Sequence, residues 1–286
     1  MTERPSPTPS PDSNTPVGAR VGFIGGGRMA QALARGIAEN PSTRGWSIAF
    51  HDPSPAAAES FQKSVPQARL CQDNQAVCQS SELVLLAVKP QLVADVLPRL
   101  ATDLADRLVL SVVAGLKLER LASMIGHHRI VRAMPNTPAL VGEGATAFAP
   151  GSKCSAADRA LVASALGAVG WAAEVPERML DAVTGLSGSG PAYVMLIIEG
   201  LADGGVRMGL PRDIAHQLAV RTVLGSARLV EQTGEHPAIL REQVTSPGGT
   251  TAAGLAALEQ GAVRYHLQAA VEAAARRAFE LGQSES

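Results

Sequence analysis

A glycine-rich turn near the amino terminus is the first feature of the chain that could do chemistry. The apolar run Val21–Ile24 leads directly into Gly25, Gly27 and Ala30 at the spacing G-x-G-x-x-A, and a helical stretch follows. The first glycine permits a tight turn, the second lets the backbone approach a pyrophosphate, and the small third residue lets the helix pack closely on the strand. Because the amides at a helix N-terminus favour anions, the turn predicts a dinucleotide-binding site. A glycine turn with a purely structural role is the alternative.

A carboxylate, Asp52, stands at the end of the second predicted strand. An acidic residue at that point can bond the ribose hydroxyls of an adenosine, and its charge repels a 2′-phosphate. No Lys or Arg follows before Lys63. On this chemistry the site favours NADH over NADPH, unless Asp52 only opens the turn with Pro53.

A second group of polar residues lies in the stretch SPGGTT at 246–251, directly ahead of another helical run. Backbone amides and hydroxyls converge at such a helix N-terminus and favour a carboxylate. A helix cap with nothing bound is the alternative, since Ser and Thr commonly cap helices. The candidate substrate-binding residues are Ser246, Gly248, Gly249, Thr250 and Thr251.

Two patterns of secondary structure must position these groups. From Arg20 to about Phe148, short β-rich runs alternate with helical stretches, which predicts βαβ units and a parallel sheet covered on both faces. From Ser155 onward helix follows helix, and the longest are expected over 193–208, 212–231 and 261–281. The expected fold class is an α/β Rossmann-type N-terminal domain followed by an all-α C-terminal domain.

The domain boundaries follow from the same change of pattern. We expect the dinucleotide-binding Rossmann domain over 19–150 and the helical domain over 151–286. Residues 1–18 contain five prolines and hardly any apolar side chain, so they are expected to be a disordered extension.

The composition is that of an ordinary globular protein, with 286 residues, 46% of them hydrophobic. A net charge of −1 provides no basic surface for nucleic acid or an anionic membrane. No apolar run reaches the roughly 18 residues that a transmembrane helix needs. Three cysteines without a CxxC spacing indicate neither a disulfide framework nor a zinc site. We expect a cytoplasmic protein with a small-molecule substrate and no metal.

Four further segments complete a larger pattern: LLAVKPQ at 85–91, VRAMPNTPALVGEGAT at 131–146, LSGSGPAY at 186–193 and VTSPGGTTAAGLAALE at 244–259. Together with the glycine turn they resemble the pyrroline-5-carboxylate reductases, the last enzymes of proline biosynthesis. The resemblance extends in the correct order over nearly the whole chain, from Arg20 to Leu281.

The resemblance implies a Rossmann domain that binds NADPH or NADH and a helical dimerisation domain that forms a homodimer, or a larger ring such as a decamer. Asp52 departs from the family, because some members carry a small polar side chain there for the 2′-phosphate. Ser187 and Ser189 are expected near the junction of cofactor and substrate. The implied cofactor contacts are Ile24, Gly25, Gly26, Gly27, Arg28, Met29, Asn74, Ala87, Val88, Lys89, Pro90 and Ala114, to which the chemistry adds Asp52.

The reaction that the resemblance implies is reduction of (S)-1-pyrroline-5-carboxylate to L-proline. An imine that binds protonated is already an electrophile, so the protein must align the reactants and exclude water rather than supply a strong acid. We expect Thr251 to bond the ring nitrogen as the catalytic residue, while Ser246 and the amides near Gly249 hold the carboxylate.

Two other functions remain open at this stage. A β-hydroxyacid dehydrogenase shares the architecture but needs a proton acceptor, commonly a lysine of the helical domain. The four lysines of the chain, at 63, 89, 117 and 153, all precede the helical run after Ser155. A non-catalytic dinucleotide sensor would have no need for the hydroxyl-rich SPGGTT stretch.

Overall fold

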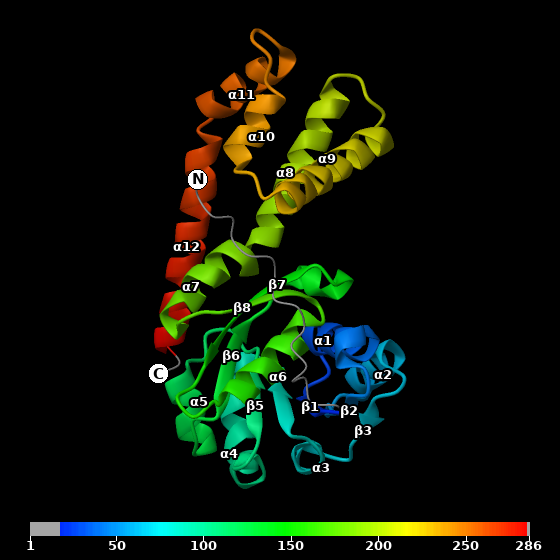
Figure 1. Ribbon diagram of the computed structural model, residues 1–286, viewed down its shortest axis with the longest axis vertical. Coiled ribbons are helices and arrows are strands. Elements are labelled where there is room, and N and C mark those ends of the chain that lie inside the picture. The colour runs from blue at the N-terminus through cyan, green and yellow to red at the C-terminus, as the bar shows by residue number, and fades with distance from the viewer. Residues whose placement is uncertain (1–17, 285–286) are drawn as a thin grey trace. The chain divides into compact units, whose positions relative to one another are not determined.

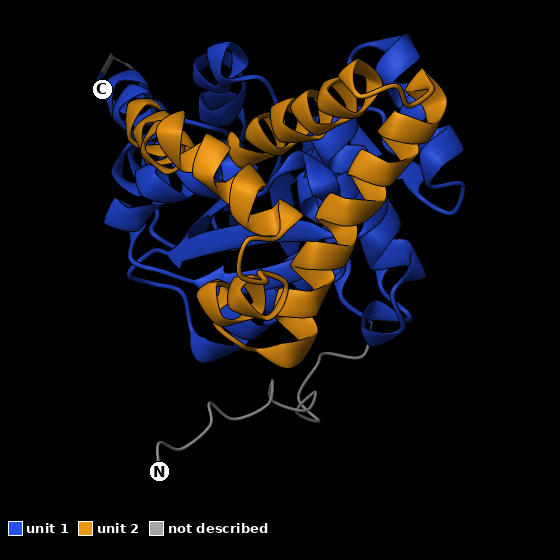
Figure 2. Ribbon diagram, turned by 90° about the horizontal axis from the view of Figure 1, so that it is seen from above, with its two compact units in different colours: residues 1–188, 274–286 blue, residues 189–273 orange. Residues whose placement is uncertain are grey.

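A computed structural model describes residues 18–284 of the chain (Figure 1). These residues fall into two compact units (Figure 2): the sheet unit, which extends to Gly188 and resumes at Ala274, and the helical unit, Ser189–Ala273. The extension predicted over 1–18 lies outside the described residues except for Gly18.

The sheet unit is built on an eight-stranded sheet in the order β3-β2-β1-β4-β5-β6-β7-β8. Neighbouring strands from β3 to β6 are parallel, β7 is antiparallel to β6, and β8 is parallel to β7. The strand order reverses direction between β1 and β4, which is where ligands bind in wound α/β sheets. The strands are β1 (Arg20–Ile24), β2 (Ser47–His51), β3 (Arg69–Leu70), β4 (Leu83–Leu86), β5 (Leu108–Ser111), β6 (Ile130–Met134), β7 (Gly144–Pro150) and β8 (Gly170–Glu174).

Helices cover both faces of the sheet, as the alternation of strands and helices predicted. Successive strand residues point to opposite faces. In β4, Leu83 and Leu85 therefore enter one buried apolar cluster, while Val84 and Leu86 enter the other. The expected Rossmann-type fold is confirmed. The α-helices of this unit are α1 (Arg28–Glu39), α2 (Pro55–Ser64), α3 (Asn74–Ser80), α4 (Val93–Leu104), α5 (Leu118–Ile125), α6 (Ala156–Gly167) and α7 (Leu180–Val183).

The structure differs from the predicted domain boundary at residue 150. Both β7 and β8 belong to the same sheet, and α6 packs on it, so the sheet unit continues to Gly188. The sequences GATAFAP and GWAAE consist largely of small residues with weak strand preference. They become strands because β6 offers a free edge with which β7 can pair.

The helical unit contains the long helices that the sequence predicted. They are α8 (Gly190–Arg207), α9 (Arg212–Thr233) and α12 (Val263–Ser284), of which α12 continues into the sheet unit from Ala274. Two shorter helices, α10 (Pro237–Gln243) and α11 (Thr250–Gln260), lie between α9 and α12 in the chain. Large apolar side chains of this unit are exposed, Leu196 at 68% and Met208 at 86%. An apolar surface of this kind is typical of an association interface. In the described part of the chain, no helix has both the length and the apolar character needed to cross a membrane.

An ion pair joins α6 to the start of β6. Asp158 is buried and accepts bonds from Arg129, whose Nη2 lies 2.7 Å from Oδ1, and from the backbone amide of Ser155 at 2.9 Å. The Ser155 hydroxyl accepts in return from the Asp158 amide, which completes a capping box. Burial alone would raise the pKa of Asp158, but the bonds from Arg129 and Ser155 outweigh it and hold that pKa below its usual 3.8.

We expect Asp158→Asn to lower the free energy of unfolding by about 2 kcal/mol, and the melting temperature with it, because it removes the charge of one member of a largely buried ion pair. The pKa of Asp158 is lower in the folded than in the unfolded protein. Its contribution to the free energy of unfolding is therefore fully present above the unfolded-state pKa and is lost as the pH falls through the folded-state pKa. Melting curves of both proteins should therefore converge in acid. The control is Glu174→Gln in the exposed pair with Arg159, where a change below about 0.5 kcal/mol is expected. Equal losses in the two variants would contradict this account.

Candidate active site

Loops at one edge of the parallel sheet bring together the residues predicted to bind the cofactor. Strands β1, β2, β4 and β5 run in the same direction, so the segments that follow them emerge at the carboxyl edge. Residues 24–29 follow or end β1, Asp52 follows β2, Asn74 begins α3, residues 87–90 follow β4, and Ala114 lies beyond β5. All of them belong to the sheet unit.

The glycine turn after β1 is fixed by a close backbone approach. Gly25 has a φ of +98°, and a Cβ atom there would lie 2.8 Å from the carbonyl oxygen of Ala87 in the turn after β4. Both the conformation and the space therefore require glycine. Gly27 is the N-cap residue of α1, and a Cβ built on it would meet no atom within 4 Å. The first turn of α1 contains no acidic residue and no side-chain cap, so its amides face open space that fits a pyrophosphate.

The Asp52 carboxylate links the turns after β1 and β2. Its Oδ2 accepts a bond from the Gly26 amide at 2.7 Å, and its Oδ1 accepts from the Ser54 amide at 2.8 Å. Asp52 therefore stabilises the turn that contains Pro53 and also contacts the glycine turn. A carboxylate has about four acceptor positions, so two bonds leave capacity for a ribose hydroxyl.

A hollow of about 410 Å³ is lined by the end of β2, the start of α3 and residues of α4. The side-chain oxygen of Asn74 is buried and has no hydrogen-bond partner among the described residues. A buried acceptor without a partner indicates a missing donor, and an adenosine carries both amino and hydroxyl donors. The Asn74 oxygen and the hollow therefore suit the adenosine half of a dinucleotide. The hollow is lined by His51, Asp73, Asn74, Gln75, Asp95, Val96, Arg99 and Leu100, of which only Asn74 was predicted.

The SPGGTT segment caps α11 in the helical unit. Gly248 has a φ of +69°, and the Gly249 amide donates to the Ser246 carbonyl at 3.0 Å. A Cβ at Gly249 would lie 2.3 Å from the Ser246 hydroxyl oxygen, so that hydroxyl lies over the N-cap residue of α11.

The start of α11 has free donors. No side chain caps the helix, and its first internal bond runs from the Ala253 amide to the Gly249 carbonyl. The amides of Thr250 and Thr251 thus have no partner within the helix. Among the described residues, the Ser246 and Thr251 hydroxyls also make no hydrogen bond. These donors and hydroxyls suit a carboxylate with an adjacent polar atom.

The MPNTP segment has a supporting role. Asn136 is buried, and its amide nitrogen donates to the Ser187 carbonyl at 3.1 Å while its side-chain oxygen accepts from the Ala145 amide at 2.9 Å. It therefore connects the loop after β6 with β7 and with the π-helical turn Thr184–Gly188. The expected place of Ser187 and Ser189 at the junction of cofactor and substrate stays a prediction.

Sequence reasoning missed one charged cluster of the sheet unit. Arg132 of β6 is buried and donates to Glu177 at 3.2 Å, and the same Glu177 oxygen accepts from the Leu118 amide at 2.7 Å. Glu177 thereby caps α5 from a distant part of the chain. An arginine inside the apolar run RIVRAM was the available signal, because a buried charge needs a partner.

Two family models match parts of the chain. The model described as "Pyrroline-5-carboxylate reductase dimerisation" matches residues 177–281, and "NADP oxidoreductase coenzyme F420-dependent" matches residues 20–115. The chain is 50% identical to a pyrroline-5-carboxylate reductase of Synechocystis over 92% of this chain and 98% of that protein. It is 45% identical to the Arabidopsis thaliana enzyme over 93% and 96% of the two chains.

Solved structures of similar proteins agree with these matches. A pyrroline-5-carboxylate reductase from Coxiella burnetii is 35% identical and superposes with a TM-score of 0.86, covering 92% of this chain and 98% of that one. A pyrroline carboxylate reductase of Plasmodium falciparum with NADP bound is 32% identical, with a TM-score of 0.81 and coverage of 93% and 99%.

We expect Asp52→Asn to raise the ratio of kcat/KM with NADPH to that with NADH by about tenfold, because it removes a charge that repels the 2′-phosphate. Asparagine keeps one oxygen that can accept from the Gly26 or Ser54 amide. Asp52→Ser removes that oxygen and shortens the side chain, so we expect it to weaken both cofactors while shifting the ratio the same way. Steady-state kinetics with both cofactors measure the effect. An unchanged ratio in Asp52→Asn would show that the carboxylate does not face the adenosine ribose.

Proposed function

The chain belongs to the pyrroline-5-carboxylate reductase family, and from this premise we propose which of its residues carry the reaction. The protein reduces (S)-1-pyrroline-5-carboxylate to L-proline with NADPH or NADH, the last step of proline biosynthesis. The observation that carries the residue assignment is the pair of open helix N-termini, one at the glycine turn and one at SPGGTT.

The residues at the carboxyl edge of the sheet hold the cofactor. The α1 amides after Gly27 bind the pyrophosphate, Asp52 and Asn74 face the adenosine half, and the turns that contain residues 87–90 and Ala114 complete the edge. When bound, NADPH or NADH supplies the hydride that the imine carbon accepts.

The SPGGTT segment holds the substrate. Ser246 and the amides of Thr250 and Thr251 bind the carboxylate, whose charge is favoured at the N-terminus of α11. The protonated ring nitrogen donates to the Thr251 hydroxyl oxygen, which orients one face of the ring. Since the iminium is already electrophilic, this neutral hydroxyl is sufficient, and no strong acid is required.

The helical unit does not suit the chemistry of a β-hydroxyacid dehydrogenase. Residues 189–273 contain no lysine that could accept the proton of an alcohol. His236 accepts from the Ala238 amide and caps α10, which is a structural task. A dinucleotide sensor is likewise disfavoured, since the similarity to the reductases extends through SPGGTT.

The chain carries a dimerisation domain. We propose a homodimer, with a ring such as a decamer as the larger assembly, because the exposed apolar side chains of α8 and α9 need a covering surface. A cytoplasmic location is also a proposal. It is supported by three cysteines that are buried and free, as expected in a reducing compartment. Neither nucleic acid nor membrane is part of the proposal.

The direct test mixes the protein with pyrroline-5-carboxylate and either NADPH or NADH and follows the nicotinamide absorbance, with proline measured as the product. We expect cofactor oxidation that requires the imine and yields one proline per cofactor. Binding without oxidation would favour a sensor. Oxidation of NADPH by a ketoacid but not by the imine would favour alcohol chemistry.

We expect Thr251→Ala to lower kcat by between a few-fold and about a hundredfold with little change in cofactor affinity. A hydrogen bond to a charged partner contributes about 1.5–3 kcal/mol, and about 1.4 kcal/mol corresponds to tenfold in rate. The exchange leaves the α11 amides in place. Thr251→Ser, which keeps the hydroxyl, is the matched control and should retain most of the activity.

Ser246→Ala should instead raise the KM for the imine, because a carboxylate bond is present equally in the ground and transition states. Measured kcat and KM values for both variants separate the two roles. If Thr251→Ala is kinetically silent while Ser246→Ala abolishes turnover, the assignment of roles within SPGGTT is wrong.

A further inference from the structure

We propose that the last turns of α12 are a positioning element of the cofactor site. Phe279 and Gly282 hold the segment between β5 and α5, residues 112–117, in the conformation that receives NADPH or NADH. We refer to this segment as the β5–α5 turn. The inference rests on the proposed function, because Ala114 of this turn is one of the proposed cofactor contacts.

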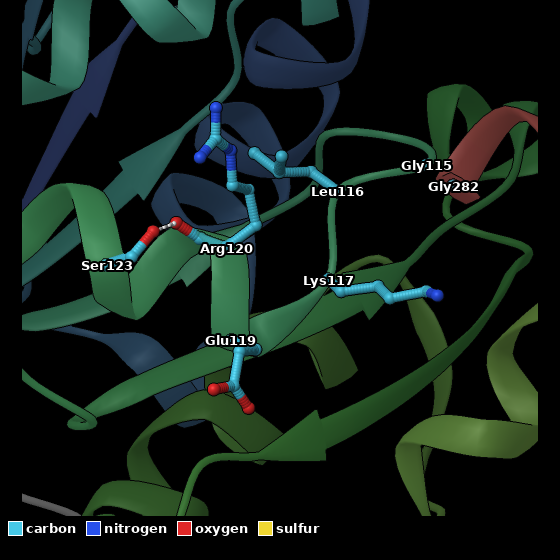
Figure 3. Close-up of a pocket in the computed structure, with 7 residues that line it drawn as sticks. All are labelled: Gly115, Leu116, Lys117, Glu119, Arg120, Ser123 and Gly282. Atoms are coloured by element: carbon cyan, nitrogen blue, oxygen red, sulfur yellow. Dashed lines mark hydrogen bonds between the residues drawn. The ribbon is translucent and has the colours of Figure 1, made fainter. Parts of the chain in front are cut away.

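The first contact is a close approach between two glycines. Gly282 is buried, and a Cβ built on it would lie 3.1 Å from the Gly115 carbonyl oxygen and 3.6 Å from Cε of Lys117. Figure 3 shows Gly282, at the end of α12, beside Gly115. Gly115 directly follows Ala114 and has a φ of +79°. The helix therefore fixes the peptide next to the proposed cofactor contact, in a conformation that only glycine adopts easily.

The second contact lies on the same face of α12. The Lys117 ammonium is 5.7 Å from the centre of the Phe279 ring, within the range of a cation–π interaction. Phe279 and Gly282 are three residues apart, so they are neighbours on the helix surface. In Figure 3 the Lys117 side chain points in a different direction from that of Arg120, the other basic residue nearby. The helix thus holds the β5–α5 turn at two of its positions.

The end of the β5–α5 turn is held by a different part of the chain. Leu118, the first residue of α5, donates its amide to Glu177 at 2.7 Å, and Glu177 is in turn held by the buried Arg132. The start of the turn is fixed by β5, where the Val112 amide donates to the Leu86 carbonyl at 3.1 Å. Within the turn, Val113 and Leu116 are buried in an apolar cluster of the sheet unit. The contact with α12 therefore acts on the peptide between them, at Ala114 and Gly115, and on the Lys117 side chain.

The turn has space into which it can move. A hollow of about 330 Å³ adjoins it (Figure 3). The exposed Ala114 and the half-buried Gly115 beside the hollow are not locked by packing, in contrast to Val113 and Leu116 in the filled core. Loss of the α12 contact would therefore let the middle of the turn relax. The hollow is lined by Gly115, Leu116, Lys117, Glu119, Arg120, Ser123 and Gly282.

Gly282→Val tests the inference, because its side chain would have to displace the Gly115 carbonyl. We expect the Kd for NADPH, measured by nicotinamide fluorescence without substrate, to rise about tenfold, since small displacements of positioning groups have effects of this order. The KM for the imine, the melting temperature and the mass by light scattering should stay close to those of the unmodified protein. If the end of α12 had only a structural role, cofactor affinity would not fall while the imine KM and the melting temperature stay unchanged.

Gly167→Val is the matched control. Gly167 ends α6, is exposed, and has no atom within 4 Å of a built Cβ, so the same substitution there should leave cofactor affinity unchanged. Phe279→Leu provides a second variant that keeps an apolar helix surface but removes the ring beside Lys117. It should raise the Kd for NADPH in the same direction by about threefold.

The possible outcomes separate the inference from the proposed function. If the unmodified protein does not reduce the imine, the proposed function fails. If it does, and both variants bind NADPH like the Gly167→Val control, the positioning role is overturned. A parallel loss of cofactor affinity, imine affinity and melting temperature would also overturn it, because the end of α12 would then serve stability alone.

Discussion

The close approach of two backbone turns, at Gly25 and Ala87, is the constraint on which the proposed cofactor site depends. These turns follow β1 and β4, the two strands between which the order of the sheet reverses. A side chain at Gly25 would separate them and rotate the start of α1 away from the sheet edge. The Gly26 amide, held by Asp52, adds the turn after β2 to the same arrangement. Three loops are thereby positioned by backbone contacts and one carboxylate.

The two proposed binding sites rely on the same physical device. At the starts of α1 and α11, amides without partners face outward with neither an acidic residue nor a side-chain cap to satisfy them. One start suits the pyrophosphate of the cofactor and the other suits the substrate carboxylate. Because a protonated imine accepts a hydride without a strong acid, neutral hydroxyls such as that of Thr251 can complete the site. The chemistry explains why no lysine is needed in the helical unit.

The helix α12 has a place in both dimerisation and the proposed cofactor binding, which two separate family models describe. Residues 263–281 of α12 fall in the region matched by the dimerisation model, and its last turns lie against the β5–α5 turn of the sheet unit. Glu177, which begins the same matched region, caps α5 through the Leu118 amide. Near its two ends, the matched region therefore contacts Lys117 of the β5–α5 turn through Phe279 and the adjoining Leu118 through Glu177.

The sequence by itself determined the features that depend on local spacing: the G-x-G-x-x-A turn, the alternation of strands and helices, and the SPGGTT residues ahead of α11. These features can be predicted from the sequence because residues close together in the chain create them. Only the tertiary structure decided that β7 and β8 join the sheet and that Asp52 accepts from the Gly26 amide. It also decided that Asn136 links the loop after β6 to β7 and to the π-helical turn, and that Gly282 lies against Gly115. Each of these contacts joins residues that are far apart in the chain. Which residues become partners depends on the strand edges, hydrogen-bond donors and surfaces that remain available once the core has folded.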